Sequence, residues 1–95
     1  MKIERDQWVW VVVQGPGKDE QMLGQHDSEQ NISFIPTFID KETGQECLGY
    51  LVRDEGKKYE LQAILYAELE RHSEGNGFML YVLSESGEIL EKIRP

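Results

Sequence analysis

One strand near the start of the chain decides the fold: Trp8-Val9-Trp10-Val11-Val12-Val13-Gln14. β-Branched and aromatic residues fill this stretch, and Gly15-Pro16-Gly17 ends it as a turn. Successive side chains of a strand point to opposite faces, so Trp8 and Trp10 share a face with Val12, and the other valines share the second face. A strand that is apolar on both faces is normally central, with other elements covering each side.

Further strands and two helices are expected downstream. The patterning predicts strands over residues 32–39, 59–66 and 78–83, a returning partner strand over 88–93, and a weak strand over 21–25. Pro36 has no N–H to donate, so the strand over 32–39 is expected to lie at an edge or to be bulged. A short helix over 67–74 is expected to end at Gly75-Asn76-Gly77, which supplies a left-handed residue.

The other helix begins after Asp40, a good N-cap, and is expected to run to about residue 52 or 53. Gly44 and Gly49 each weaken it by up to ~1 kcal/mol relative to alanine, so packing must hold it. With two helices and four to six strands, the economical arrangement is an α+β fold with a single, mostly antiparallel sheet and both helices packed on one face. The chain of 95 residues has room for one core, so residues 1–95 are expected to form a single domain.

Charge and composition exclude several classes of partner. The chain has 18 acidic and 10 basic residues and a net charge of −8, and only Lys57 and Lys58 are adjacent basic residues. Nucleic-acid affinity depends on lysine and arginine neutralising phosphates, so no nucleic-acid partner is expected, and an anionic membrane surface is disfavoured for the same reason. No apolar run approaches the length of about 18 residues that a membrane helix needs.

For each candidate catalytic residue, a structural or surface role is the simpler interpretation. Cys47 lies on an apolar helix stripe with Leu48 and Leu51, which favours a buried hydrophobe over a nucleophile. As the single cysteine, it forms neither an internal disulfide nor a CxxC site, and a reducing, bacterial-type cytoplasm is the simplest location. The charged first residues do not resemble a secretory signal. His26 lacks a second cluster with metal-ligand spacing, and His72 is read as a helix-surface residue.

Gly15-Pro16-Gly17-Lys18 follows a strand, but it lacks the spacing of a phosphate-binding loop, and no helix opens behind it. The sequence therefore predicts a turn here. With no catalytic residue, metal site or cofactor indicated elsewhere, the chain is expected not to be an enzyme.

The two tryptophans carry the functional hypothesis. If the helices cover the valine face of the first strand, Trp8 and Trp10 lie on the open face of the sheet, where Tyr66 and Ile64 join them if the register allows. An open face of this kind needs a cover: the 18–31 loop, a second copy, or another partner. The opposite assignment, with the tryptophans under the helices, would remove the argument.

The sequence thus predicts a non-enzymatic protein-interaction or regulatory module, working as a homodimer or with a different protein. The alternative is a small-ligand-binding domain with a pocket between the tryptophan face and the 18–31 loop.

Several segments also suggest a family. An apolar strand runs into an acidic helix start, a second strand leads into a Glu-rich helix, and a Gly-Phe step precedes a later strand: Phe38-Ile39-Asp40-Lys41-Glu42, Tyr59-Glu60-Leu61-Gln62-Ala63-Ile64 with Glu68-Leu69-Glu70, and Gly77-Phe78. This order resembles a short domain of unknown function found in cyanobacteria and plant plastids. Ile35-Pro36-Thr37-Phe38 is similar, less closely, to the N-terminal domain of the enhanced-serine-sensitivity (SseB) family. Neither resemblance implies a catalytic residue.

Overall fold

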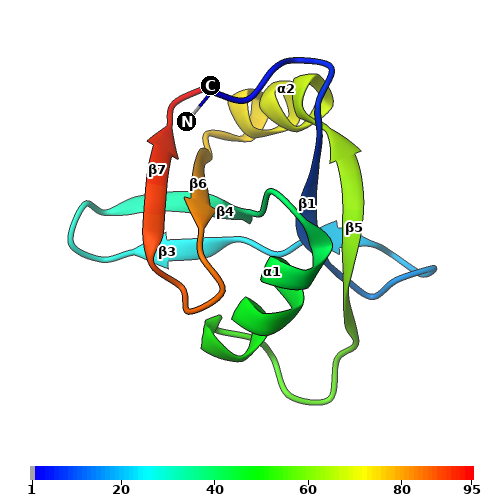
Figure 1. Cartoon of the computed structure of the whole chain (residues 1–95). Helices are drawn as coiled ribbons and strands as arrows, with labels where there is room; N and C mark the ends of the chain where they lie inside the picture. Colours follow the sequence, from blue (N-terminus) through cyan, green and yellow to red (C-terminus); the bar gives the residue numbers. More distant parts are fainter. Residues whose placement is uncertain (1) are drawn as a thin grey trace.

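The computed structural model describes residues 2–95, which fold into seven strands and two α-helices with one short 3₁₀ helix (Figure 1). The α+β class predicted from the sequence is confirmed. In chain order the elements are β1 (Trp8–Gln14), β2 (Gln21–Met22), β3 (Gln25–Asp27), β4 (Ile32–Thr37), α1 (Lys41–Cys47), η1 (Leu48–Tyr50), β5 (Tyr59–Leu65), α2 (Tyr66–Asn76), β6 (Met79–Leu83) and β7 (Ile89–Ile93).

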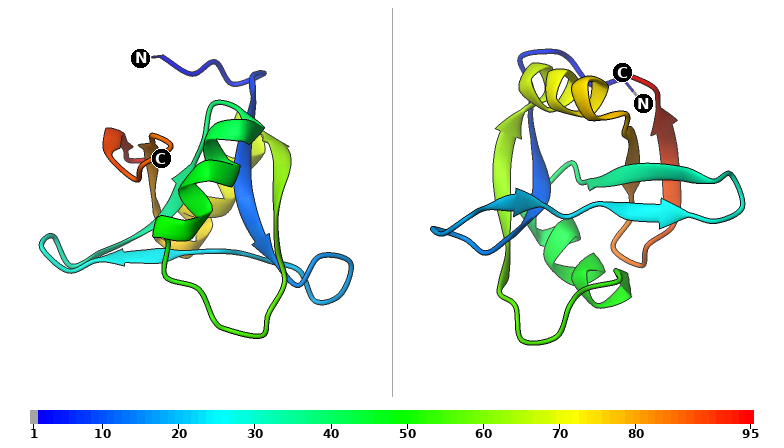
Figure 2. Two further views of the ribbon diagram at one scale, coloured as in Figure 1. Left: turned by 60° about the horizontal axis from the view of Figure 1, so that its bottom comes forward. Right: turned by 180° about the vertical axis from the view of Figure 1, so that it is seen from behind.

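The seven strands form two sheets, so the prediction of a single sheet of four to six strands is wrong, although the α+β class holds. One sheet has the order β2-β1-β5 and is antiparallel, and the other has the order β3-β4-β6-β7 with β4 and β6 parallel. Only Leu23 and Gly24 separate β2 from β3, so one nearly continuous segment pairs first with β1 and then with β4 (Figure 2). A backbone pair between Trp10 and Phe38, with N···O distances of 2.8 and 2.9 Å, also links the sheets.

β1 is the central strand that its sequence predicts, and each of its faces has its own helix. Val9, Val11 and Val13 pack in a core cluster that includes residues of α2, whereas Val12 packs in a second cluster that includes Cys47 of α1. The expectation that both helices cover one face is therefore wrong. The physical reason is β1 itself, because a strand with two apolar faces must bury both.

The predicted helix ends are largely confirmed. Asp40 caps α1, since its Oδ1 accepts a hydrogen bond of 2.8 Å from the backbone N–H of Thr43. Gly77 ends α2 in the left-handed conformation with φ of 74°. α1 is shorter than expected, because after Cys47 the chain continues as the 3₁₀ turn η1 and is extended again at Leu51.

Pro36 lies in β4, which has β3 on one side and β6 on the other, so β4 is not an edge strand over its whole length. Its register with β6 is unbroken from Phe34 to Thr37, so the alternative of a bulge at Pro36 is wrong. β3 pairs only with residues 32–34 of β4, whereas Pro36 itself lies opposite Tyr81 of β6. Beside Pro36, β4 therefore has a strand partner on the β6 side alone, which is where a residue without an N–H is tolerated.

Tyr81 joins the strands of the second sheet. Its fully buried ring stacks on Phe34 of β4, with 4.1 Å between ring centroids, and its hydroxyl donates a hydrogen bond of 2.9 Å to Oδ2 of Asp27 in β3. Nζ of Lys92 in β7 lies 5.2 Å from the ring and 3.9 Å from the same carboxylate oxygen. The Tyr81 hydrogen bond is the main reason that the pKa of Asp27 is lowered.

Candidate functional site

A partly exposed apolar strip lies on the β1–β5 sheet. In the antiparallel register, Trp8 is opposite Leu65 and Trp10 is opposite Ala63, so these four residues share one face; we call them the aromatic strip. Trp8 is 58% exposed and Ala63 is also exposed, whereas Trp10 and Leu65 are half-buried. The open aromatic face expected from the sequence therefore exists in part, at the start of β1.

Helix α1 determines where the strip begins. It packs over the other half of the same face, against Leu61 and Phe38, and Gly44 makes this close approach feasible. Lys41, its first residue, places Nζ 5.7 Å from the Trp10 ring, a favourable cation–π distance. Trp10 thus marks the border between the covered and the uncovered part of the face.

The structure separates the four predicted interface residues into two pairs. Trp8 and Trp10 share a face, but Ile64 lies opposite Val9 and so belongs to the other face. Tyr66 begins α2, is 5% exposed, and packs in the cluster of Val9 and Leu69, where burial raises the pKa of its hydroxyl. The strip residues that the sequence reading missed are Ala63 and Leu65. The register of β5 against β1 would have identified them.

A hollow of about 560 Å³ lies beside the 18–31 loop. The loop contributes Leu23, Gly24, Gln25 and His26 to its lining, which also includes Tyr59 and Phe78. The Gln25 side-chain amide is already engaged, since it donates to the carbonyl of Val52 and accepts from its N–H, both at 2.8 Å. These two bonds attach the loop to the segment before β5.

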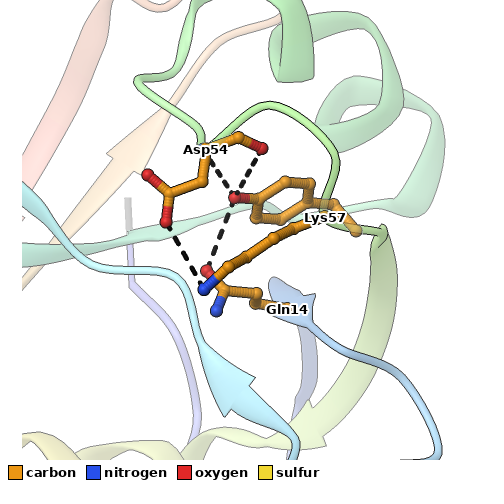
Figure 3. A network of polar contacts seen from close by, with 4 residues as sticks. Gln14, Asp54 and Lys57 are labelled. Atoms are coloured by element: carbon orange, nitrogen blue, oxygen red, sulfur yellow. Dashed lines mark hydrogen bonds and ion pairs between the residues drawn. The ribbon is translucent and has the colours of Figure 1, made fainter.

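Three residues that line this hollow, Gln14, Asp54 and Tyr59, take part in a polar network (Figure 3). The Tyr59 hydroxyl accepts a hydrogen bond of 2.7 Å from the backbone N–H of Asp54 and lies 3.4 Å from Oε1 of Gln14. Nζ of Lys57 lies 3.6 Å from the Asp54 carboxylate. The network holds the 54–59 turn against the end of β1.

The other candidate residues do not come together into a catalytic site. Cys47 is fully buried in an apolar cluster, and burial raises the pKa of its thiol, which favours the unreactive protonated form. His26 is an exposed residue at the 560 Å³ hollow, whereas His72 is exposed on α2. Across residues 2–95, no three His, Cys, Asp or Glu side chains are arranged to hold a metal ion.

The Gly15-Pro16-Gly17 segment is a turn, and a carboxylate of the same loop, that of Glu20, binds to it. The N–H of Gly17 donates a hydrogen bond of 2.7 Å to Oε2 of Glu20, and this bond is the main reason that the pKa of Glu20 is lowered. Because a side-chain carboxylate of the same loop occupies the N–H group that a phosphate would need, the turn interpretation is the better one.

Comparisons with protein-family models, with curated proteins and with solved structures found no match. The family resemblance of the sequence therefore stays a prediction. Within the described part of the chain, no helix has both the length and the apolar character to cross a bilayer.

Proposed function

We propose that this protein is a non-enzymatic protein-interaction module of the cytoplasm that binds its partner through the aromatic strip. The observation that carries the proposal is Trp8, which is more than half exposed beside Trp10 and Leu65 while α1 covers only the neighbouring half of the face. Tryptophan is enriched at interface hot spots because its large ring loses much contact with water on binding. Together the strip residues form one apolar surface.

The free energy gained by covering Trp8 is large enough to support recognition of a partner. A tryptophan buries about 150–250 Å² when fully covered, and 58% of Trp8 is exposed. Covering that fraction at roughly 25 cal/mol per Å² contributes on the order of 3 kcal/mol before the costs of association are subtracted. Leu65 and Trp10 add to this surface.

Site-specific crosslinking in the native cell tests the proposal. A photoreactive phenylalanine analogue in place of Trp8 is expected to give a discrete protein adduct. The same analogue in place of Val52, which is 80% exposed on a loop outside the strip, serves as the matched control. If position 8 yields no adduct beyond that at position 52, the proposed function is wrong.

A second candidate function is small-ligand binding in the hollow beside the 18–31 loop, whose volume of about 560 Å³ is in the range of known ligand sites. Leu23 and Phe78 give the hollow an apolar lining and Asp54 adds a carboxylate, a combination that suits a small amine with an apolar group. The free amino acids and biogenic amines are the probes: at about 100 times its Kd, a ligand adds about 2.7 kcal/mol of stability and raises Tm. Ser33→Trp, which fills the hollow, should remove the rise. No change in Tm with any of these probes contradicts this candidate.

A further inference from the structure

The outer edge of β5 is a long, regular, open strand edge. β5 pairs with β1 over all seven of its residues and ends its sheet on the other side. Figures 1 and 2 show no helix or strand of residues 2–95 outside β5; on that side only the loop between β1 and β2 extends farther out. An edge strand presents a row of unpaired N–H and C=O groups that can hydrogen-bond to another strand.

The backbone groups that face outward can be identified. Trp10 uses both its N–H and its C=O on Phe38, so neither group points at β5. Paired residues in an antiparallel ladder alternate between bonded and non-bonded pairs, so Ala63, opposite Trp10, also turns its groups away from β1. By the same alternation, Leu61 faces outward with both groups, and Leu65 with its N–H. The C=O of Leu65 is engaged, because Leu65 is the N-cap of α2 and accepts the first hydrogen bond of that helix.

The other sheet edges are shorter or irregular. β2 has two residues and β3 has three, while β7 has five, with a register irregularity opposite Val82 and Leu83 and with Glu91 and Lys92 within it. Short edges, bulges and charges are the usual protections against unwanted pairing. β5 has seven residues, an unbroken register with β1, neither proline nor lysine, and one charged residue, Glu60, near its start.

We infer that β5 pairs with β5 of a second copy of this chain, antiparallel and centred on Ala63, to form a six-stranded sheet across the two copies. This inference rests on the proposed function and names its partner. The two-fold arrangement places Ala63 opposite Ala63 of the second copy, and Leu61 opposite Leu65. We call this contact the β5 seam. It makes about four backbone hydrogen bonds: two between the Ala63 residues, and one from each Leu65 N–H to the C=O of Leu61 on the other strand.

The charges around β5 fit a second copy. Lys57 and Lys58 precede the strand, and Glu68 follows it in the first turn of α2. The antiparallel arrangement brings Lys58 toward Glu68 of the second copy. It also places Glu60 opposite Tyr66, so that the two Glu60 side chains are roughly 20 Å apart along the seam.

The aromatic strip also fits a second copy. α1 covers Leu61 and leaves Leu65 and Trp8 less covered. Because the pairing places Leu61 of the second copy next to Leu65, α1 of that copy lies beside the bare half of the strip. Each copy thus supplies the cover that the other lacks.

The oligomeric state of the full chain tests the inference by size exclusion with light scattering across a concentration series. The wild type is expected to have the mass of two chains at high concentration. Ala63→Lys places two ammonium groups across the two-fold axis and is expected to be monomeric. Ala63→Pro removes an N–H that makes no bond to β1 and is also expected to be monomeric. The matched control is Leu90→Lys on the β7 edge, 54% exposed, which should remain dimeric.

Amide hydrogen exchange of the wild type gives a second measurement that needs no variant. Exchange at Ala63 and Leu65 is expected to slow as concentration rises. A wild type that is monomeric at every concentration, or a folded Ala63→Lys that is still dimeric, overturns the β5 seam. A Trp8 crosslink to a different protein, with a monomeric wild type, also overturns the seam and leaves the proposed function standing.

Discussion

Tyr81→Ala is expected to lower the free energy of unfolding by about 3–5 kcal/mol, the usual cost of removing a large aromatic side chain from a core. The ring is fully buried and stacked on Phe34, so its removal leaves a cavity beside Phe34 and removes the hydrogen bond to Asp27. A domain of this kind has a total stability of about 5–15 kcal/mol, so the variant should be close to unfolding. Urea denaturation with linear extrapolation measures the change.

The matched control for Tyr81→Ala is Tyr81→Phe, which keeps the stacked ring and removes only the hydroxyl. Its loss of stability should be smaller and should depend on pH, because the Tyr81 hydrogen bond lowers the pKa of Asp27 below its ordinary value of 3.8. A carboxyl with a lowered pKa in the folded state stabilises the fold above its ordinary pKa, and this contribution is lost as pH falls through the folded value. The wild type should therefore lose more stability in acid than Tyr81→Phe. A difference between the two that stays constant with pH would contradict the role given to Asp27.

Local patterns predicted the elements of this fold better than their arrangement. The alternation in β1 correctly predicts two buried faces, and Asp40 and Gly77 correctly predict helix ends. The division into two sheets depends instead on two features. At Leu23-Gly24 the chain stops pairing with β1 and begins to pair with β4, and the backbone of Trp10 pairs with that of Phe38. Main-chain hydrogen bonds between distant segments leave no mark in side-chain patterning, so the sequence alone favoured one sheet.

The residues of the aromatic strip were also only partly predictable from the sequence. That Trp8 and Trp10 share a face follows from the period of a strand, whereas their neighbours depend on the register of β5. A shift of one residue exchanges the faces of a strand, and the structure places Ala63, not Ile64, opposite Trp10. β1 and β5 are not joined by a hairpin turn whose residues would set that register. Ile64 and Tyr66 were therefore assigned to the wrong side.

Gly44→Ala is expected to destabilise the protein by about 1–3 kcal/mol, the typical cost of overpacking a core. Helix propensity alone predicts the opposite, a gain of up to ~1 kcal/mol. A Cβ atom at Gly44 would be 3.0 Å from Cδ2 of Phe38 and closer still to Cδ1 of Leu61, and both side chains are buried. Since neither neighbour has free space to enter, either α1 moves away from the sheet or the core is strained.

Gly75→Ala is the matched control, because Gly75 is also helical, with no atom within 4 Å of a Cβ built there. It should raise the free energy of unfolding by up to ~1 kcal/mol, so the two substitutions are expected to have opposite signs in the same urea experiment. If both stabilise the protein, α1 does not lie against Leu61 as described. The border of the aromatic strip at Trp10 would then also be wrong, because that border depends on how closely α1 approaches the sheet at Gly44.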